Sequence, residues 1–160
     1  MLLDGQPIDG FRGHPLGLAI DLGTTAIVID FVDLESGQTL GRSAFANPQS
    51  FGGSDVMSRI SFDSGGNDEL QHAVVRAING EITALSERFG FRRREIYEIA
   101  VGGNATMRDI FFGLNAQGIG QKPYKSLIEH AYGAGKRPNM AIEAPAKNLG
   151  ILANKHTRAY

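Results

Sequence analysis

The stretch LGLAIDLGTTAIVIDFV, residues 16–32, decides the fold of this chain. Its first part, Leu16 to Asp21, is short and apolar, which is typical of a buried strand. Its last part, Ala26 to Val32, is rich in β-branched residues and predicts a second strand. Because only a short run around Gly23-Thr24-Thr25 separates the two parts, the stretch predicts a β-hairpin.

The hairpin is followed by further regular elements. Residues 39–45 predict a third strand, which would complete an antiparallel meander. Apolar residues at three-to-four spacing predict a long helix from Leu70 to Phe89. Asn67 is a suitable N-cap for this helix, and Gly90 suits the position after its C-terminus.

Beyond this helix, residues 96–101 predict a fourth strand and residues 105–112 a second helix. The resulting order, β-β-β-α-β-α, predicts the α/β fold class. We expect one lobe over residues 15–120, after an irregular lead-in over residues 1–14. Residues 121–160 include three prolines and predict an irregular connector.

The composition narrows the possible functions. Sixteen Lys and Arg against seventeen Asp and Glu give a net charge of −1, whereas general nucleic-acid or anionic-membrane binders carry a basic excess. No apolar run approaches the ~20 residues of a membrane span. The chain has no cysteine, which excludes disulfides and a Cys-bound iron–sulfur cluster within it and suits the cytoplasm. We therefore expect neither nucleic acid nor a membrane as partner.

The hairpin turn carries residues suited to phosphate binding. Gly23 allows a phosphate close to the backbone, and the N–H groups of such a turn can converge on an anion. Thr24 and Thr25 add hydroxyl donors. Asp21 would repel phosphate unless a cation lies between them, and a hydrated Mg²⁺ is the natural choice. The alternative is an ordinary hairpin, since Asp, Gly and Thr are common turn residues.

A second corner follows the fourth predicted strand. Gly102, Gly103 and Asn104 form a turn before the next helix, and such a corner can face a ligand. The alternative is a βα turn in which Asn104 or Thr106 caps the helix. Both corners follow the C-terminal ends of strands, where α/β sheets usually bind ligands.

A third polar region joins Asn47-Pro48-Gln49 to residues 55–60, which predict a short helical turn. Arg59 could clamp a phosphate or carboxylate, with Asp55 as its ion partner. A solvated loop with a local ion pair is the alternative.

Five stretches, read in order, resemble the ATP-dependent reductive activators of corrinoid proteins, ferredoxin-containing members of the ASKHA ATPase superfamily. They are residues 17–25 (GLAIDLGTT), Asn47-Pro48-Gln49, residues 53–61 (GSDVMSRIS), residues 101–107 (VGGNATM) and residues 118–124 (GIGQKPY). The resemblance implies a ribonuclease-H-like lobe of the actin, sugar-kinase and heat-shock ATPase type.

The resemblance also implies a function. Such activators return the inactive Co(II) state of a corrinoid-dependent methyltransferase to Co(I), using one electron from an iron–sulfur domain and the support of ATP. By the match, Asp21 would hold Mg²⁺ through water, and the Gly23-Thr24-Thr25 turn would contact the β- and γ-phosphates of ATP. Gly103 and Asn104 would lie next to the nucleotide, and no residue is assigned as catalytic.

The chain also departs from the family pattern. Without cysteine it holds no ferredoxin domain, and it ends at Tyr160, before the second lobe that completes the nucleotide site in such proteins. We expect the first lobe of a two-lobed protein, with exposed apolar surface that leads to self-association or pairs with a missing lobe. Its expected protein partner is a corrinoid protein or corrinoid-dependent methyltransferase.

Two other functions stay open. The chain could be a lobe of another ASKHA enzyme, a sugar or acyl kinase, or a catalytically silent docking module for a corrinoid protein or methyltransferase. Mg²⁺-dependent nucleotide binding would separate the two enzymes from the docking module. Phosphate transfer to a small molecule would separate the kinase from the activator.

Overall fold

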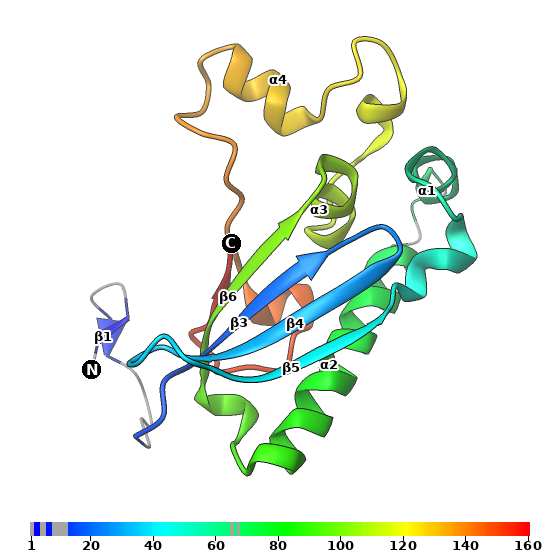
Figure 1. Ribbon diagram of the computed structural model, residues 1–160. Coiled ribbons are helices and arrows are strands. Elements are labelled where there is room, and N and C mark those ends of the chain that lie inside the picture. Colours follow the sequence, from blue (N-terminus) through cyan, green and yellow to red (C-terminus); the bar gives the residue numbers. More distant parts are fainter. Residues whose placement is uncertain (1, 4–5, 8–12, 65, 67) are drawn as a thin grey trace.

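The computed structural model describes residues 2–3, 6–7, 13–64, 66 and 68–160 (Figure 1). The strands are β1 (Leu2–Leu3), β2 (Gln6–Pro7), β3 (Leu16–Leu22), β4 (Ala26–Asp33), β5 (Thr39–Ala46), β6 (Ile96–Gly103), β7 (Ala144–Pro145) and β8 (Arg158–Ala159). The α-helices are α1 (Val56–Asp63), α2 (Glu69–Phe89), α3 (Ala105–Phe111) and α4 (Leu127–Gly133). Short 3₁₀ turns are η1 (Pro48–Gly52), η2 (Arg93–Glu95), η3 (Gln117–Gly120) and η4 (Ala146–Leu149).

One sheet, in the order β5-β4-β3-β6-β8-β7, forms the centre of the lobe. The strands β3, β4 and β5 form an antiparallel meander, whereas β6 runs parallel to β3 and β8 runs parallel to β6. The hairpin and the meander predicted from the sequence are therefore confirmed. This order, with α2 between the meander and the first parallel strand, confirms the α/β, ribonuclease-H-like fold class.

The core forms between one face of this sheet and α2. Alternate residues of β3 and β4 are buried, as expected where side chains point to opposite faces in turn. The inner side chains of the strands and of α2 form one cluster, which includes Leu18, Ile20, Leu22, Ile27, Ile29, Leu70, Val74, Ile78 and Ile82. Burial of this apolar surface is the main driving force that holds helix and sheet together.

The long helix agrees with its prediction at its C-terminal end, whereas its N-cap is Asp68 and not the predicted Asn67. Gly90 follows α2 in the left-handed region, with φ of 74°, which a residue without a Cβ adopts at little cost. At the other end Asp68 occupies the N-cap position with φ of 51°, and its side chain makes no capping hydrogen bond. The predicted cap, Asn67, lies outside the described residues.

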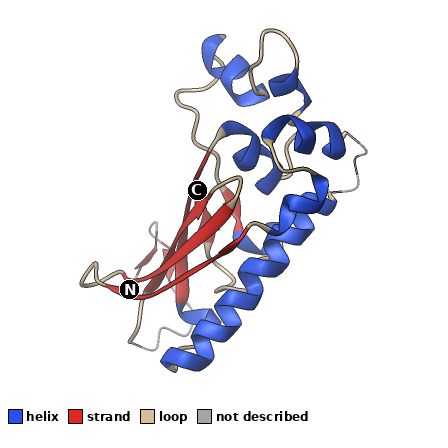
Figure 2. Ribbon diagram, turned by 45° about the vertical axis from the view of Figure 1, so that its right-hand side comes forward, coloured by secondary structure: helices blue, strands red, loops and turns tan. Residues whose placement is uncertain are grey.

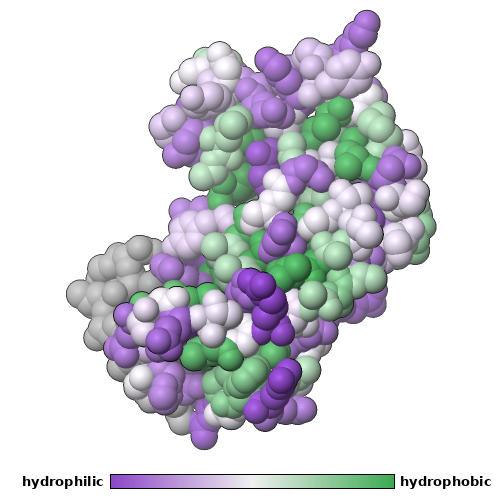
Figure 3. All heavy atoms as spheres, in the orientation of Figure 1, coloured by the Kyte–Doolittle hydropathy of each residue, from purple (hydrophilic) through white to green (hydrophobic). Residues whose placement is uncertain are grey.

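The face of the sheet opposite α2 is bare among the described elements (Figure 2). Ala19 and Asp21 of β3 and Ala100 and Gly102 of β6 are exposed on it. Figure 3, which looks onto this side, shows apolar patches broken by polar residues, and an indentation between the sheet and the upper arm that carries α4.

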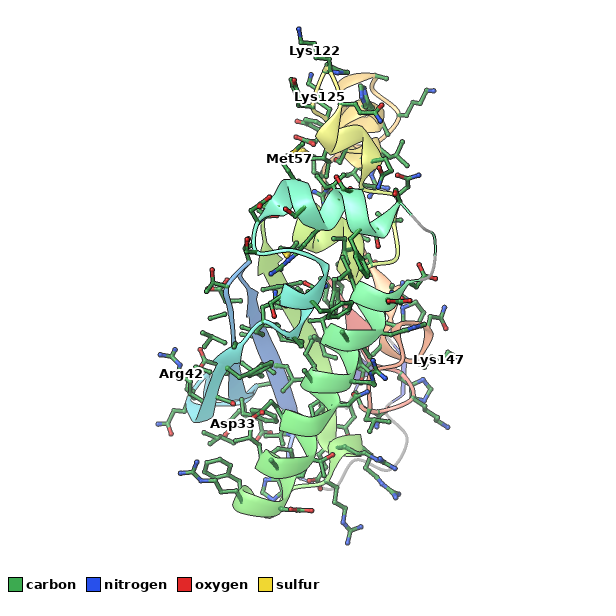
Figure 4. The ribbon with its side chains drawn as sticks, turned by 90° about the vertical axis from the view of Figure 1, so that its right-hand side faces the viewer. Asp33, Arg42, Met57, Lys122, Lys125 and Lys147 are labelled. Carbon is green, nitrogen blue, oxygen red and sulfur yellow. The ribbon has the colours of Figure 1, made fainter. Side chains whose placement is uncertain are left out.

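Residues 121–160 differ from the irregular connector that the sequence predicts. They contain α4, whose N-cap Ser126 forms a capping box with Glu129, and two strands that extend the main sheet. The strand β8 pairs with β6, where Ala159 lies opposite Ile99. This segment thus returns to the core, and only its arm projects outward, with Lys122 and Lys125 toward its tip (Figure 4). The domain boundary at residue 120 stays a prediction.

Only part of the predicted lead-in over residues 1–14 is described. There β1 and β2 pair as a two-residue antiparallel ladder, and residues 1, 4–5 and 8–12 lie outside the described residues. None of the described helices combines the length and apolar character that crossing a membrane requires.

Gly80 within α2 and Gly90 just after it should respond oppositely to replacement by alanine. A Cβ at exposed Gly80 would meet nothing within 4 Å, so Gly80→Ala should raise the free energy of unfolding by about 0.5–1 kcal/mol through higher helix propensity. The control, Gly90→Ala, places a Cβ at φ of 74° and should lower it by about 1 kcal/mol. Urea unfolding measures both changes, and equal signs would contradict the assigned helix end.

Candidate functional site

The turn between β3 and β4 places its glycine where only glycine fits. A Cβ at Gly23 would lie 2.6 Å from the carbonyl oxygen of Ala26, inside the hairpin. The requirement is therefore one of space rather than of a left-handed backbone, because Gly23 is not among the residues with positive φ. Thr24 is half-buried beside it and Thr25 is exposed, so both hydroxyls lie at or near the surface.

The second predicted corner lies directly beside the first. In the parallel pairing of β3 with β6, Leu22 is opposite Gly103, and a Cβ at Gly103 would lie 2.9 Å from the Leu22 carbonyl oxygen. Asn104 caps α3, where its Oδ1 accepts the Met107 N–H at 3.0 Å. Its Nδ2 donates to Thr24 Oγ1 at 3.2 Å, so the same side chain caps the helix and joins the two corners.

Asp21 reaches the bare face of the sheet one residue before these turns. It lines an open hollow of about 380 Å³ whose floor includes small residues, among them Ala19, Ala100 and Gly102. The nearby Asp30 is paired with Arg42 at 2.6 Å, and this guanidinium lowers the pKa of the Asp30 carboxyl. None of the ion pairs among the described residues includes Asp21, which leaves its carboxylate available for a cation.

A buried polar layer lies beneath the hairpin, built from side chains that the sequence alone did not place there. Asn47, Gln49 and Arg59 are each at most 2% exposed. Asn47 Nδ2 donates to the Gly23 carbonyl oxygen at 2.7 Å, and Arg59 Nη2 donates to the Thr24 carbonyl oxygen at 2.6 Å. Gln49 Oε1 accepts hydrogen bonds from Asn47 Nδ2 at 3.2 Å and from Arg59 Nη1 at 3.4 Å, so the three side chains form one network.

The predicted roles of Arg59 and Asp55 are wrong. Arg59 is neither a solvated clamp nor half of a local ion pair, because its Nε donates to the Gly53 carbonyl oxygen at 3.0 Å and its Nη1 contacts Met107 Sδ at 3.2 Å. Burial lowers the pKa of the guanidinium, which nevertheless stays protonated at neutral pH. Asp55 instead caps α1, where hydrogen bonds from Ser58 lower the pKa of its carboxyl.

The described residues contain no cluster of three or more His, Asp or Glu that could hold a metal ion without other ligands. A single carboxylate such as Asp21 fits Mg²⁺, which keeps several water ligands and takes others from substrate phosphates. The site thus fits a magnesium ion that arrives with a phosphate compound better than a resident metal.

The meander, the parallel strand β6 and the paired corners define an α/β lobe of the ribonuclease-H-like class. The chain belongs to the family described as the RACo middle region, whose family model matches residues 16–159. The match includes both corners and the segment that carries α4 and β8.

Two relatives show what else the chain resembles. The corrinoid activation enzyme RamQ of Eubacterium limosum is 30% identical over 118 residues, which cover 72% of this chain and 20% of that enzyme. A solved structure described as a reductive activator for corrinoid, iron–sulfur protein is 33% identical, with a TM-score of 0.81, and the match covers 94% of this chain and 23% of that chain. The chain therefore spans less than a quarter of the length of either relative.

The crowding at Gly23 predicts that alanine at this position lowers the free energy of unfolding more than alanine at Gly102 does. Gly23→Ala forces a Cβ against the Ala26 carbonyl and should lower the free energy of unfolding by about 1–3 kcal/mol. Gly102→Ala, from the adjoining corner at the end of β6, is the matched control, because its Cβ would meet nothing within 4 Å, and its effect should stay within about 0.5 kcal/mol. Urea unfolding compares the two, and equal losses would argue against the hairpin geometry.

Proposed function

We propose that this chain forms the Mg-ATP-binding lobe of an ATP-dependent reductive activator of corrinoid-dependent methyltransferases. Its membership of the RACo middle region family supports this, as do the names of its two relatives, which describe corrinoid activation and reductive activation. The whole activator would add one electron to an inactive Co(II) corrinoid and return it to Co(I). This chain would contribute the nucleotide-binding part of that task.

The hydrogen bond from Asn104 to Thr24 carries the proposal, because it joins the two glycine corners into one site at the ends of β3 and β6. Such strand ends are where α/β sheets usually bind ligands. Backbone N–H groups of the Gly23-Thr24-Thr25 turn and the two threonine hydroxyls would donate to the β- and γ-phosphates. Gly103 and Asn104 would border the same nucleotide.

Asp21 would hold Mg²⁺ through water beside these phosphates. The ion, when bound, neutralises negative charge that builds up on the phosphate oxygens. The exposed position of the carboxylate, free of ion pairs among the described residues, fits this role. The bare sheet face next to it would then be closed by a second lobe or by a second copy of the chain.

The electron would reach the corrinoid from another part of the activator, since a chain without cysteine offers no thiolate ligands for an iron–sulfur cluster. Binding of ATP, or its hydrolysis to ADP and phosphate, would supply free energy for the uphill reduction. The proposed partner is a corrinoid protein or a corrinoid-dependent methyltransferase, and the proposed location is the cytoplasm.

Calorimetric titration of the chain with ATP, with and without Mg²⁺, tests this function. We expect saturable heat that requires Mg²⁺, and at least about a tenfold rise in Kd for Asp21→Asn or Thr24→Ala, because each removes a contact to charged groups. Asp30→Asn is the matched control. Asp30 is a second carboxylate on the bare face, but Arg42 already forms an ion pair with it. Its replacement should therefore leave the Kd for Mg-ATP within about twofold.

Two outcomes would contradict the proposal. A folded chain that binds no nucleotide would favour the docking module, and phosphate transfer from ATP to a sugar or acyl acid would favour the kinase lobe. Equal loss of affinity in Asp21→Asn and Asp30→Asn would show that general charge on the sheet face, not a defined magnesium position, governs binding.

A further inference from the structure

Two consecutive carbonyl groups of the hairpin turn each accept a hydrogen bond from a different buried side chain. The Gly23 carbonyl accepts from Asn47 Nδ2 at 2.7 Å, and the Thr24 carbonyl accepts from Arg59 Nη2 at 2.6 Å. The Thr25 carbonyl accepts the backbone N–H of Asn47 at 2.8 Å. All three oxygens therefore face the buried side of the turn.

The orientation of these carbonyls fixes the orientation of the amides that follow them. In a trans peptide the C=O and the next N–H point to opposite sides. The N–H groups of Thr24 and Thr25 therefore point away from Asn47 and Arg59, toward the outer side of the turn. Within the described residues neither N–H donates to another protein group.

Among the described residues the guanidinium of Arg59 beneath the turn makes no ion pair, although the Asp55 carboxylate interacts with it electrostatically. The hydrogen-bond acceptors of Arg59 are neutral: the Gly53 and Thr24 carbonyls, Gln49 Oε1 and Met107 Sδ. Buried charges are ordinarily paired, because removing a charge from water is costly. An anion on the outer side of the turn would supply further negative charge beside that of Asp55.

We propose that Arg59 and Asn47 are positioning residues that set the Thr24 and Thr25 amides toward a bound phosphate, with Arg59 adding a buried positive charge behind them. The identity of the anion as a nucleotide phosphate rests on the proposed function. The orientation of the turn rests on the hydrogen bonds alone. Asn47 orients the Thr24 amide by holding the Gly23 carbonyl, and Arg59 orients the Thr25 amide by holding the Thr24 carbonyl.

Three variants of the full chain test this assignment. Asn47→Ser removes the Nδ2 donor and keeps an oxygen for the Gln49 N–H, and Arg59→Met removes the charge and the donors but keeps an unbranched stem. Met107→Leu is the matched control, because Met107 contacts Arg59 in the same buried layer and no hydrogen bond among the described residues joins it to the Gly23-Thr24-Thr25 turn. Urea unfolding measures the stability of each variant.

The decisive measurement is the NMR chemical shift and hydrogen-exchange rate of the two threonine amides in the ligand-free chain. Asn47→Ser should alter mainly the Thr24 amide and Arg59→Met mainly the Thr25 amide, whereas Met107→Leu should alter neither. Titration with Mg-ATP should then show a rise in Kd of about tenfold or more for Arg59→Met, and Arg59→Lys should recover part of it by restoring the charge.

Amides that stay unchanged in both Asn47→Ser and Arg59→Met, or that change equally in Met107→Leu, would overturn the assignment. If Arg59→Met does not fold, Arg59→Lys and Asn47→Ser provide the same comparison. A wild-type chain that binds no Mg-ATP would refute the proposed function, while the amide measurement would still decide how the turn is held.

Discussion

The parallel pairing of β3 with β6 is the interaction on which the candidate site depends. Its register sets Leu22 opposite Gly103, so the two strands end together and the turns that follow them meet. A close approach of backbones at this end excludes a side chain at Gly103. The hairpin tip and the start of α3 then become neighbours although about eighty residues separate them in sequence, and Asn104 can reach Thr24.

Much of this arrangement could be predicted from local patterns. The short apolar run of β3, the β-branched residues of β4 and the apolar stripe of α2 each predict an element that packs in the described core, so local sequence pattern identifies them. The strand β8 has only two residues and depends on pairing with β6, a tertiary contact without a local signature. The irregular connector predicted for residues 121–160 was wrong for that reason.

The buried polar layer shows a different limit of prediction from sequence. The sequence indicated that Arg59 could interact with a negatively charged group, but its partners are mainly backbone carbonyls, which every residue carries and no pattern reveals. The nearest hint was the combination of Asn47, Gln49 and Arg59 in a region rich in glycine. Such a combination identifies a polar cluster, and only the fold shows that the cluster is buried beneath the hairpin.

The position of α1 has a mechanical consequence. Arg59 ties this helix to the hairpin, and the carbonyl of the next residue, Ile60, accepts from Gln117 Nε2 at 2.6 Å, which ties the same helix to the segment leading into the α4 arm. The short helix α1 is therefore hydrogen-bonded both to the hairpin turn and to the segment that leads into the arm. A displacement of the segment before the arm would therefore act first on α1, the helix that also supplies the hydrogen bond to the Thr24 carbonyl.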